Sequence, residues 1–133
     1  MKRNKNKLDD AFCLHLAQLF YAVASADNVV AEEEVNALKL MIKKEWVSGN
    51  LLSNSQAKIL LSAFNQLAES RADSNQCFQT FKLYIENNNI KIATPVKNMI
   101  WKTAESIASS YAHKNKSELI VLTKLRSFFL DLP

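Results

Sequence analysis

The sequence has few residues that break or cross-link a chain. Its 133 residues include one glycine, two prolines and two cysteines. So few helix breakers favour long helices over many short strands joined by tight turns. Cys13 and Cys77 have neither CxxC spacing nor a neighbouring histidine pair, which excludes the usual zinc pattern and a secreted disulfide framework. We therefore expect both thiols to be reduced and buried.

Long apolar runs and a secretion signal are also missing. No segment has the ~18 uninterrupted apolar residues that are typical of a membrane-spanning helix. The basic stretch MKRNKNK is followed by LDDAFCLHL, so acids stand where a signal peptide has its apolar region. The cytoplasm is the expected location. A single glycine also excludes a glycine-rich phosphate loop.

Positive charge is concentrated at the start of the chain. The formal net charge is +4, from 17 basic and 13 acidic residues. Four of the basic residues precede the first acid, so the remaining 13 balance the 13 acids. These four are Lys2, Arg3, Lys5 and Lys7. A folded body that binds nucleic acid has a basic face. Contact with nucleic acid or an anionic membrane is thereby restricted to residues 1–7, which we expect to be a basic flexible arm.

Apolar residues recur at intervals of three and four along six segments, which is the pattern of amphipathic helices. None of the six is apolar all round, so each must bury its stripe against the others. We therefore expect an all-α fold, a single-domain bundle of about six helices over residues 8–133. The stretch 90–92 alternates but is too short to build a sheet. The expected helices lie at about 8–25, 31–49, 55–68, 73–87, 94–111 and 117–133.

Local signals mark where several of these helices begin and end. Thr94 followed by Pro95 predicts a helix start, with the Thr94 oxygen as the cap. Asp73, three residues before a glutamine, predicts a capping box, and Ser117 is the expected cap of the last helix. Gly49 predicts a helix end, because glycine enters the left-handed region without a Cβ penalty.

The stretch ASADNVVAEEEV, residues 24–35, places acids beside an apolar pattern. A helix that starts near Ala31 has Glu32, Glu33 and Glu34 in its first turn. Unpaired N–H groups and the helix dipole favour negative charge there by about 0.3–1 kcal/mol each. Glu34 would accept a hydrogen bond from the backbone of the cap residue, as half of a capping box. Ala31 has no side-chain oxygen for the other half.

A divalent-cation site is the alternative interpretation of the same acids. Asp27 and Glu34 are seven residues apart across a tight loop, with Glu33 as a third ligand, and carbonyls and waters could complete an oxygen shell for Ca²⁺ or Mg²⁺. The segment lacks the EF-hand spacing. The electrostatic role in the first helical turn requires no ligand and is the simpler explanation.

The same loop resembles the helix-loop-helix signature of the tellurite-resistance TerB-like family. In that family an Ala-Asp-Gly turn is followed by an apolar residue, a small or hydroxylic cap, and a glutamate that opens the next helix. The matching residues here are Ala26, Asp27, Val30, Ala31 and Glu34. A DnaJ-like membrane-anchored co-chaperone carries a similar domain. The resemblance implies a TerB-like helical fold and a role in a bacterial stress-response or envelope-associated complex.

Two features depart from the family pattern. Asn28 stands where glycine is usual, although asparagine still tolerates a left-handed turn. Ala31 stands where serine or threonine is usual, and the lost hydroxyl costs the helix start about 1 kcal/mol. The resemblance also implies a second, related helix-loop-helix, which here corresponds to residues 106–122. Ala112 and His113 replace the Ala-Asp step there, and no glutamate follows at the matching distance. We therefore expect a pseudo-repeat whose second half kept its apolar spacing and lost its acids.

Catalytic groups are absent from the sequence pattern. His15 and His113 lie far apart and lack the nucleophile context or ligand spacing of a hydrolase or metalloenzyme. Trp46, Trp101 and Tyr111 lie at the edges of helical stripes, where those that stay exposed would anchor a protein partner or a second copy. The expected function is a non-enzymatic interaction module without a cofactor. The alternative is a metal-binding or metal-sensing domain.

Overall fold

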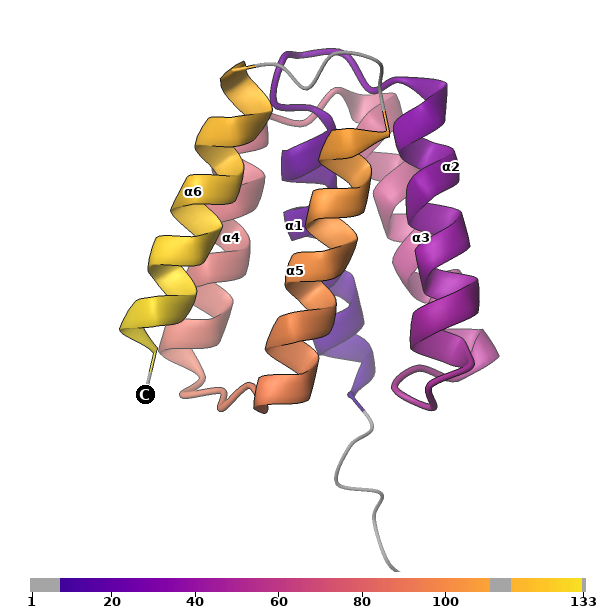
Figure 1. Cartoon of the computed structure of the whole chain (residues 1–133), viewed down its shortest axis with the longest axis vertical. Helices are drawn as coiled ribbons and strands as arrows, with labels where there is room; N and C mark the ends of the chain where they lie inside the picture. The colour runs from indigo at the N-terminus through magenta and orange to yellow at the C-terminus, as the bar shows by residue number, and fades with distance from the viewer. Residues whose placement is uncertain (1–7, 111–115, 133) are drawn as a thin grey trace, which may run out of the picture.

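Every regular element of the computed structural model, which describes residues 8–110 and 116–132, is a helix (Figure 1). The prediction of a single all-α bundle is confirmed, and residues 90–92 form no strand. In the described parts of the chain, no helix has the length and apolar character needed to cross a membrane. The elements are α1 (Asp10–Ala24), α2 (Glu32–Met41), the π-helix η1 (Ile42–Val47), α3 (Asn54–Ser70), α4 (Ser74–Asn87), α5 (Thr94–Ser109) and α6 (Lys116–Asp131).

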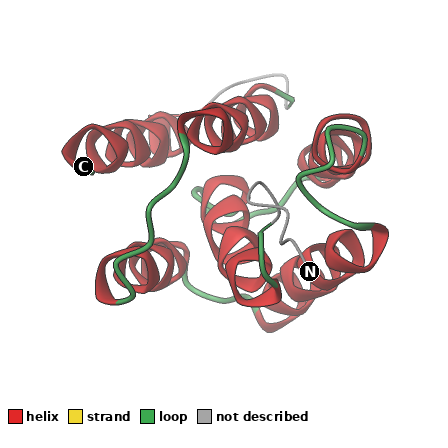
Figure 2. Cartoon of the chain, turned by 90° about the horizontal axis from the view of Figure 1, so that it is seen from below, coloured by secondary structure: helices red, strands yellow, loops and turns green. Residues whose placement is uncertain are grey.

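Helix α1 occupies the middle of the bundle, as the view along the helices in Figure 2 shows, and it contacts each of the other α-helices. Its residues 19–24 are buried without interruption. The sequence predicts a buried stripe along this helix, and in its second half the buried surface extends beyond that stripe. Ala22 and Ala24 explain the difference, because small side chains allow neighbouring helices to approach the faces outside the apolar stripe. Ser74 at the start of α4 donates a hydrogen bond to the Ala22 carbonyl at 2.7 Å.

Aromatic side chains connect α1 to its neighbours. The rings of Phe20 and Trp46 meet edge to face with centroids 6.2 Å apart, and Tyr21 and Phe64 do so at 5.9 Å. Such pairs stabilise a core by about 0.5–1.5 kcal/mol beyond the effect of burial. The Tyr21 hydroxyl also donates to the carbonyl of Ala72 at 2.8 Å. These contacts hold η1 and α3 against the central helix.

Some of the predicted helix caps are present and others are not. The backbone N–H of Gln76 donates to the carboxylate of Asp73 at 2.9 Å, as expected at the start of α4. Helix α5 begins one residue earlier than predicted. Its cap is Ala93, whose carbonyl accepts from the N–H of Lys97 at 3.0 Å, so Thr94 is the first helical residue. Ser117 lies inside α6 rather than at a cap.

The expected single helix at 31–49 consists of α2 and the π-helix η1, and Gly49 does not have the left-handed conformation predicted for it. That conformation belongs to Asn50, with φ of 61°. The Gly49 N–H donates to the Glu45 carbonyl at 3.0 Å, and a Cβ at this position would lie 2.5 Å from that oxygen. The glycine is needed because the backbone passes too close for any side chain.

Candidate functional site

The acidic stretch between α1 and α2 begins a helix as predicted. Asn28 takes a left-handed conformation with φ of 71°, and the carboxylate of Asp27 accepts from the N–H of Val29 at 3.2 Å. The carboxylate of Glu34 accepts from the N–H of Ala31, the cap residue, at 2.7 Å. Ala31 has no oxygen to return a bond, so half of a capping box is formed. This geometry confirms the helix-start interpretation of Glu34.

A carboxyl group from the other end of the chain meets Glu34. Glu118, in the first turn of α6, is 1% exposed, and Glu34 is 3% exposed. The two side chains are hydrogen-bonded. Removal from water is the main cause that raises the pKa of Glu34 to about 8, and the hydrogen bond and the charges of Glu118 and Asp27 add to it. The Ala31 N–H acts in the opposite direction. The pair therefore holds a proton at neutral pH.

The prediction that the second helix-loop-helix lost its acids was wrong for Glu118. The sequence did contain a signal for its burial. Val121, Leu122 and Leu125 follow at three, four and seven residues, which places Glu118 on the buried stripe of α6. An acid on an apolar stripe needs a buried partner. Sequence reasoning missed that partner, because nothing along the chain connects residue 118 to residue 34.

The three predicted metal ligands are not gathered into one group. Asp27 and Glu33 are exposed, whereas Glu34 is buried and one of its oxygens accepts from Ala31. Among residues 8–110 and 116–132, no three histidine, cysteine, aspartate or glutamate side chains come together in a way that could hold a metal ion.

The predicted interaction residues have different environments. Trp46 is fully buried, and its indole N–H donates to the Thr103 hydroxyl at 2.8 Å. The prediction that Trp46 anchors a partner is therefore wrong, because no partner can reach a side chain in the core. Trp101 is half-buried and faces a surface groove. Tyr111 and the arm residues Lys2, Arg3, Lys5 and Lys7 lie outside the described residues.

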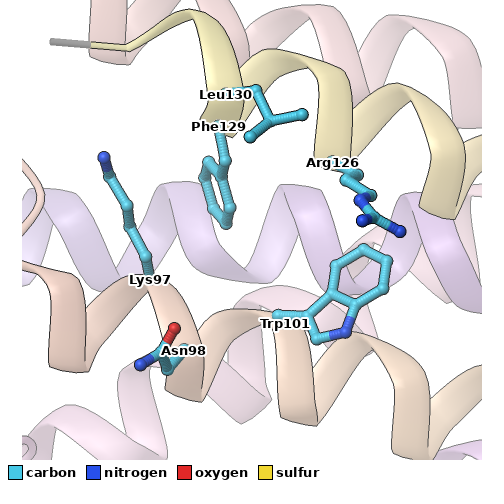
Figure 3. Close-up of a pocket in the computed structure, with 6 residues that line it drawn as sticks. All are labelled: Lys97, Asn98, Trp101, Arg126, Phe129 and Leu130. Atoms are coloured by element: carbon cyan, nitrogen blue, oxygen red, sulfur yellow. The ribbon is translucent and has the colours of Figure 1, made fainter.

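The groove beside Trp101 lies between α5 and α6 and has a volume of about 430 Å³ (Figure 3). We call it the α5–α6 groove. Its lining residues are Lys97, Asn98 and Trp101 of α5 and Arg126, Phe129 and Leu130 of α6. Three- and four-residue spacings place each set on one helix face. Leu130 is 76% exposed, which is the largest value among the exposed large apolar side chains of the described residues. The groove is thus an apolar surface that neither helix covers.

The charge of the groove is of one sign. Among the described residues that line it, Lys97 and Arg126 are the ionisable ones and none is an acid. In Figure 3 the Arg126 side chain extends toward the ring of Trp101. The neighbouring Lys102 is engaged elsewhere, in an ion pair with Glu45 at 3.2 Å. Asp131 lines a separate hollow between α4 and α6. The α5–α6 groove therefore combines aromatic surface with two cations.

The side chains of Cys13, Cys77 and His15 are engaged in packing. Cys13 and Cys77 are free and buried. Burial raises the pKa of Cys13 to about 12 and that of Cys77 to about 11, and nearby aspartates add to both shifts. Both thiols therefore stay protonated and are poor nucleophiles. The ring of His15 stacks on Tyr84 with centroids 3.7 Å apart. His113 lies outside the described residues.

Comparison with known proteins adds no relative: no family model, no curated protein and no solved structure matches the chain. The TerB-like resemblance of the loop at residues 26–34 stays a prediction.

Proposed function

We propose that this chain is a non-enzymatic protein-interaction domain that docks its partner in the α5–α6 groove. The observation that carries the proposal is the half-buried Trp101 in a groove that it lines together with Arg126, Phe129 and Leu130 (Figure 3). Tryptophan and arginine are enriched among the residues that dominate binding energy at protein interfaces. Both side chains keep polar groups in contact with water while offering large contact areas.

The TerB-like resemblance supports a setting for this function. It suggests a bacterial stress-response or envelope-associated complex in which the domain is one component. The alternative function is divalent-metal binding through Asp27 and Glu34. The described residues contain no cluster of three ligands that could hold a metal ion. We therefore propose the interaction function alone.

Site-specific photo-crosslinking in the source cells tests the proposal. A benzoylphenylalanine in place of Asn98, which is exposed and lines the groove, should trap a protein. The matched control carries the same group in place of Lys58, an exposed residue of α3 on another side of the bundle (Figure 2). We expect an adduct from the Asn98 position that the Lys58 position does not give. Identical adducts from both positions, or none from Asn98, would overturn the proposal.

A second substitution separates groove binding from chance proximity. Adding Arg126→Ala to the Asn98 cross-linker should reduce the adduct, because Arg126 is exposed and its loss leaves the core intact. Far-UV circular dichroism of the variant checks that the helices are retained. An undiminished adduct in a folded Arg126→Ala variant would show that the groove is not the docking surface.

A further inference from the structure

The α1–α2 connection presents an exposed apolar side chain among acids. Val29 is 65% exposed, and Asp27, Glu32 and Glu33 around it are exposed as well. We call these four residues the acidic turn. Glu34 alone among the neighbouring acids is buried, and it accounts for the helix start. Neither the helix cap nor the core therefore requires Val29, Glu32 and Glu33 to be exposed.

The acidic turn and the α5–α6 groove are complementary in charge and in apolar surface. The turn offers one aliphatic side chain flanked by three carboxylates, whereas the groove offers aromatic surface flanked by Lys97 and Arg126. Opposite charges around an apolar contact select a partner and fix its orientation. Among the described residues, Arg71 is the cation that lines the hollow beside Val29, and the exposed carboxylates of Glu32 and Glu33 together exceed its single charge.

The acidic turn lies at one end of the bundle, and the α5–α6 groove lies along its side toward the other end. The acidic turn is at the top of the bundle in Figure 1, where α1 connects to α2. Lys97 lies in the first turn of α5 and Leu130 in the last turn of α6, and both of these ends are at the bottom. A chain cannot bring these surfaces together within one copy. An interaction between them must join two copies.

We infer that the acidic turn of one copy docks in the α5–α6 groove of a second copy. This inference rests on the proposed function, since it names the occupant of the same groove. Residues 1–7 are not suited to that place, because their four positive charges are of the same sign as Lys97 and Arg126. Each copy has one turn and one groove, so association continues until a ring closes, and the smallest closed assembly is a dimer with two reciprocal contacts.

Sedimentation velocity of the full chain tests the inference. From about 10 µM to about 1 mM at about 0.02 M salt, the sedimentation coefficient should rise with concentration. The rise should be largely lost at about 0.5 M salt, where exposed charges are screened. Arg126→Glu, or Glu32→Lys with Glu33→Lys, should weaken association on the order of tenfold. Lys58→Glu, a charge reversal at an exposed site near the start of α3, should leave it unchanged.

Mixing the two defective proteins gives the sharpest result. The Arg126→Glu protein keeps an intact turn, and the Glu32→Lys, Glu33→Lys protein keeps an intact groove. Each alone should stay monomeric at concentrations where the unmodified chain associates, and the mixture should associate again, through the intact turn of one protein and the intact groove of the other. A chain that is monomeric throughout, a mixture without dimer, or an Arg126→Glu protein that associates normally would overturn the inference. An Asn98 adduct with a different protein would then leave the proposed function standing.

Discussion

Glu34 has two roles that depend on its neighbours. Its position as the third residue of α2 is a local property, and the hydrogen bond from Ala31 follows from that position. Its burial against Glu118 follows from the packing of α6. Two carboxyl groups in contact without water cannot both carry a charge at low cost. One proton therefore belongs to the folded state of the pair.

The free energy of unfolding should decrease as pH rises because of this proton. The folded-state pKa of Glu34 is about 8, compared with an ordinary value of 4.5. The stabilisation is fully present below pH 4.5 and is lost as pH rises through about 8. Glu34→Gln keeps the acceptor for Ala31, donates to Glu118 and does not titrate. We expect it to be more stable than the unmodified protein at pH 9 by about 2 kcal/mol, as measured by urea unfolding.

Glu33→Gln is the matched control for this change. Glu33 neighbours Glu34 and is exposed, so its substitution should reproduce the pH dependence of the unmodified protein. If Glu34→Gln unfolded at the same urea concentration as the unmodified protein at both pH 5 and pH 9, the inference that the folded pair holds a proton would be wrong.

The two tryptophans show how a similar sequence position leads to different burial. Both lie at the edge of a helical stripe, yet Trp46 is fully buried and Trp101 is half-buried. Trp46 lies in the π-helix η1, where the hydrogen-bonding pattern i to i+5 changes the direction of each following side chain. A periodicity of 3.6 residues cannot anticipate that change.

At the scale of elements, η1 depends on a polar contact with α5. Thr103 is fully buried; its hydroxyl accepts from the Trp46 indole at 2.8 Å and donates to the Met99 carbonyl at 2.8 Å. The Lys102–Glu45 ion pair connects the same two elements at the surface. An exposed pair of this kind contributes about 0.2–1 kcal/mol. The buried hydrogen bond is the stronger constraint, because the indole has no water to replace it.

Thr103→Val should lower the free energy of unfolding by about 1–3 kcal/mol. The substitution keeps the shape of the side chain and leaves the Trp46 N–H buried without an acceptor. Urea unfolding monitored by tryptophan fluorescence measures the change. Thr80→Val is the control, since Thr80 also donates to a helical carbonyl, that of Gln76, but is exposed. Equal effects of the two substitutions would contradict the importance of the Trp46 contact.

The starts of the helices could be predicted where the signal is local. Asp73 caps α4 because its carboxylate reaches an N–H three residues away, which is a distance along the chain. The start of α5 was misplaced by one residue, because the carbonyl of Ala93 already accepts a helical hydrogen bond. Gly49 was placed at a helix end for the wrong reason, since its constraint is the Glu45 carbonyl and not a left-handed turn.

At the scale of the whole molecule, the central position of α1 couples all the helices. Each of the other α-helices contacts α1, so none can retain its core contacts once α1 is displaced. The described chain should therefore unfold as one unit. The α5–α6 groove and the acidic turn keep their separation only while this unit is intact, which links any assembly through them to global stability.

Phe20→Ala tests this coupling. Phe20 is fully buried in α1 and packs on Trp46, so its truncation should lower the free energy of unfolding by about 3–5 kcal/mol. Circular dichroism and tryptophan fluorescence should report one coincident transition. Leu14→Ala, in the same helix at a site that is 46% exposed, should change the free energy by less than about 1 kcal/mol. Separate transitions for the two probes would show that the bundle is not one cooperative unit.

The sequence by itself determined the helical class, the six segments and the acidic helix start after Asp27, because each follows from contacts within a few residues of the chain. Only the tertiary structure decided which acids are buried, which tryptophan is accessible and where the α5–α6 groove lies. Glu34 contacts Glu118 because the fold brings together the first turns of α2 and α6, which are distant in sequence, and Trp101 and Arg126 line one groove because α5 and α6 lie side by side. Periodicity specifies the face that a helix buries, but the neighbour that covers this face is chosen by the packing of the complete chain.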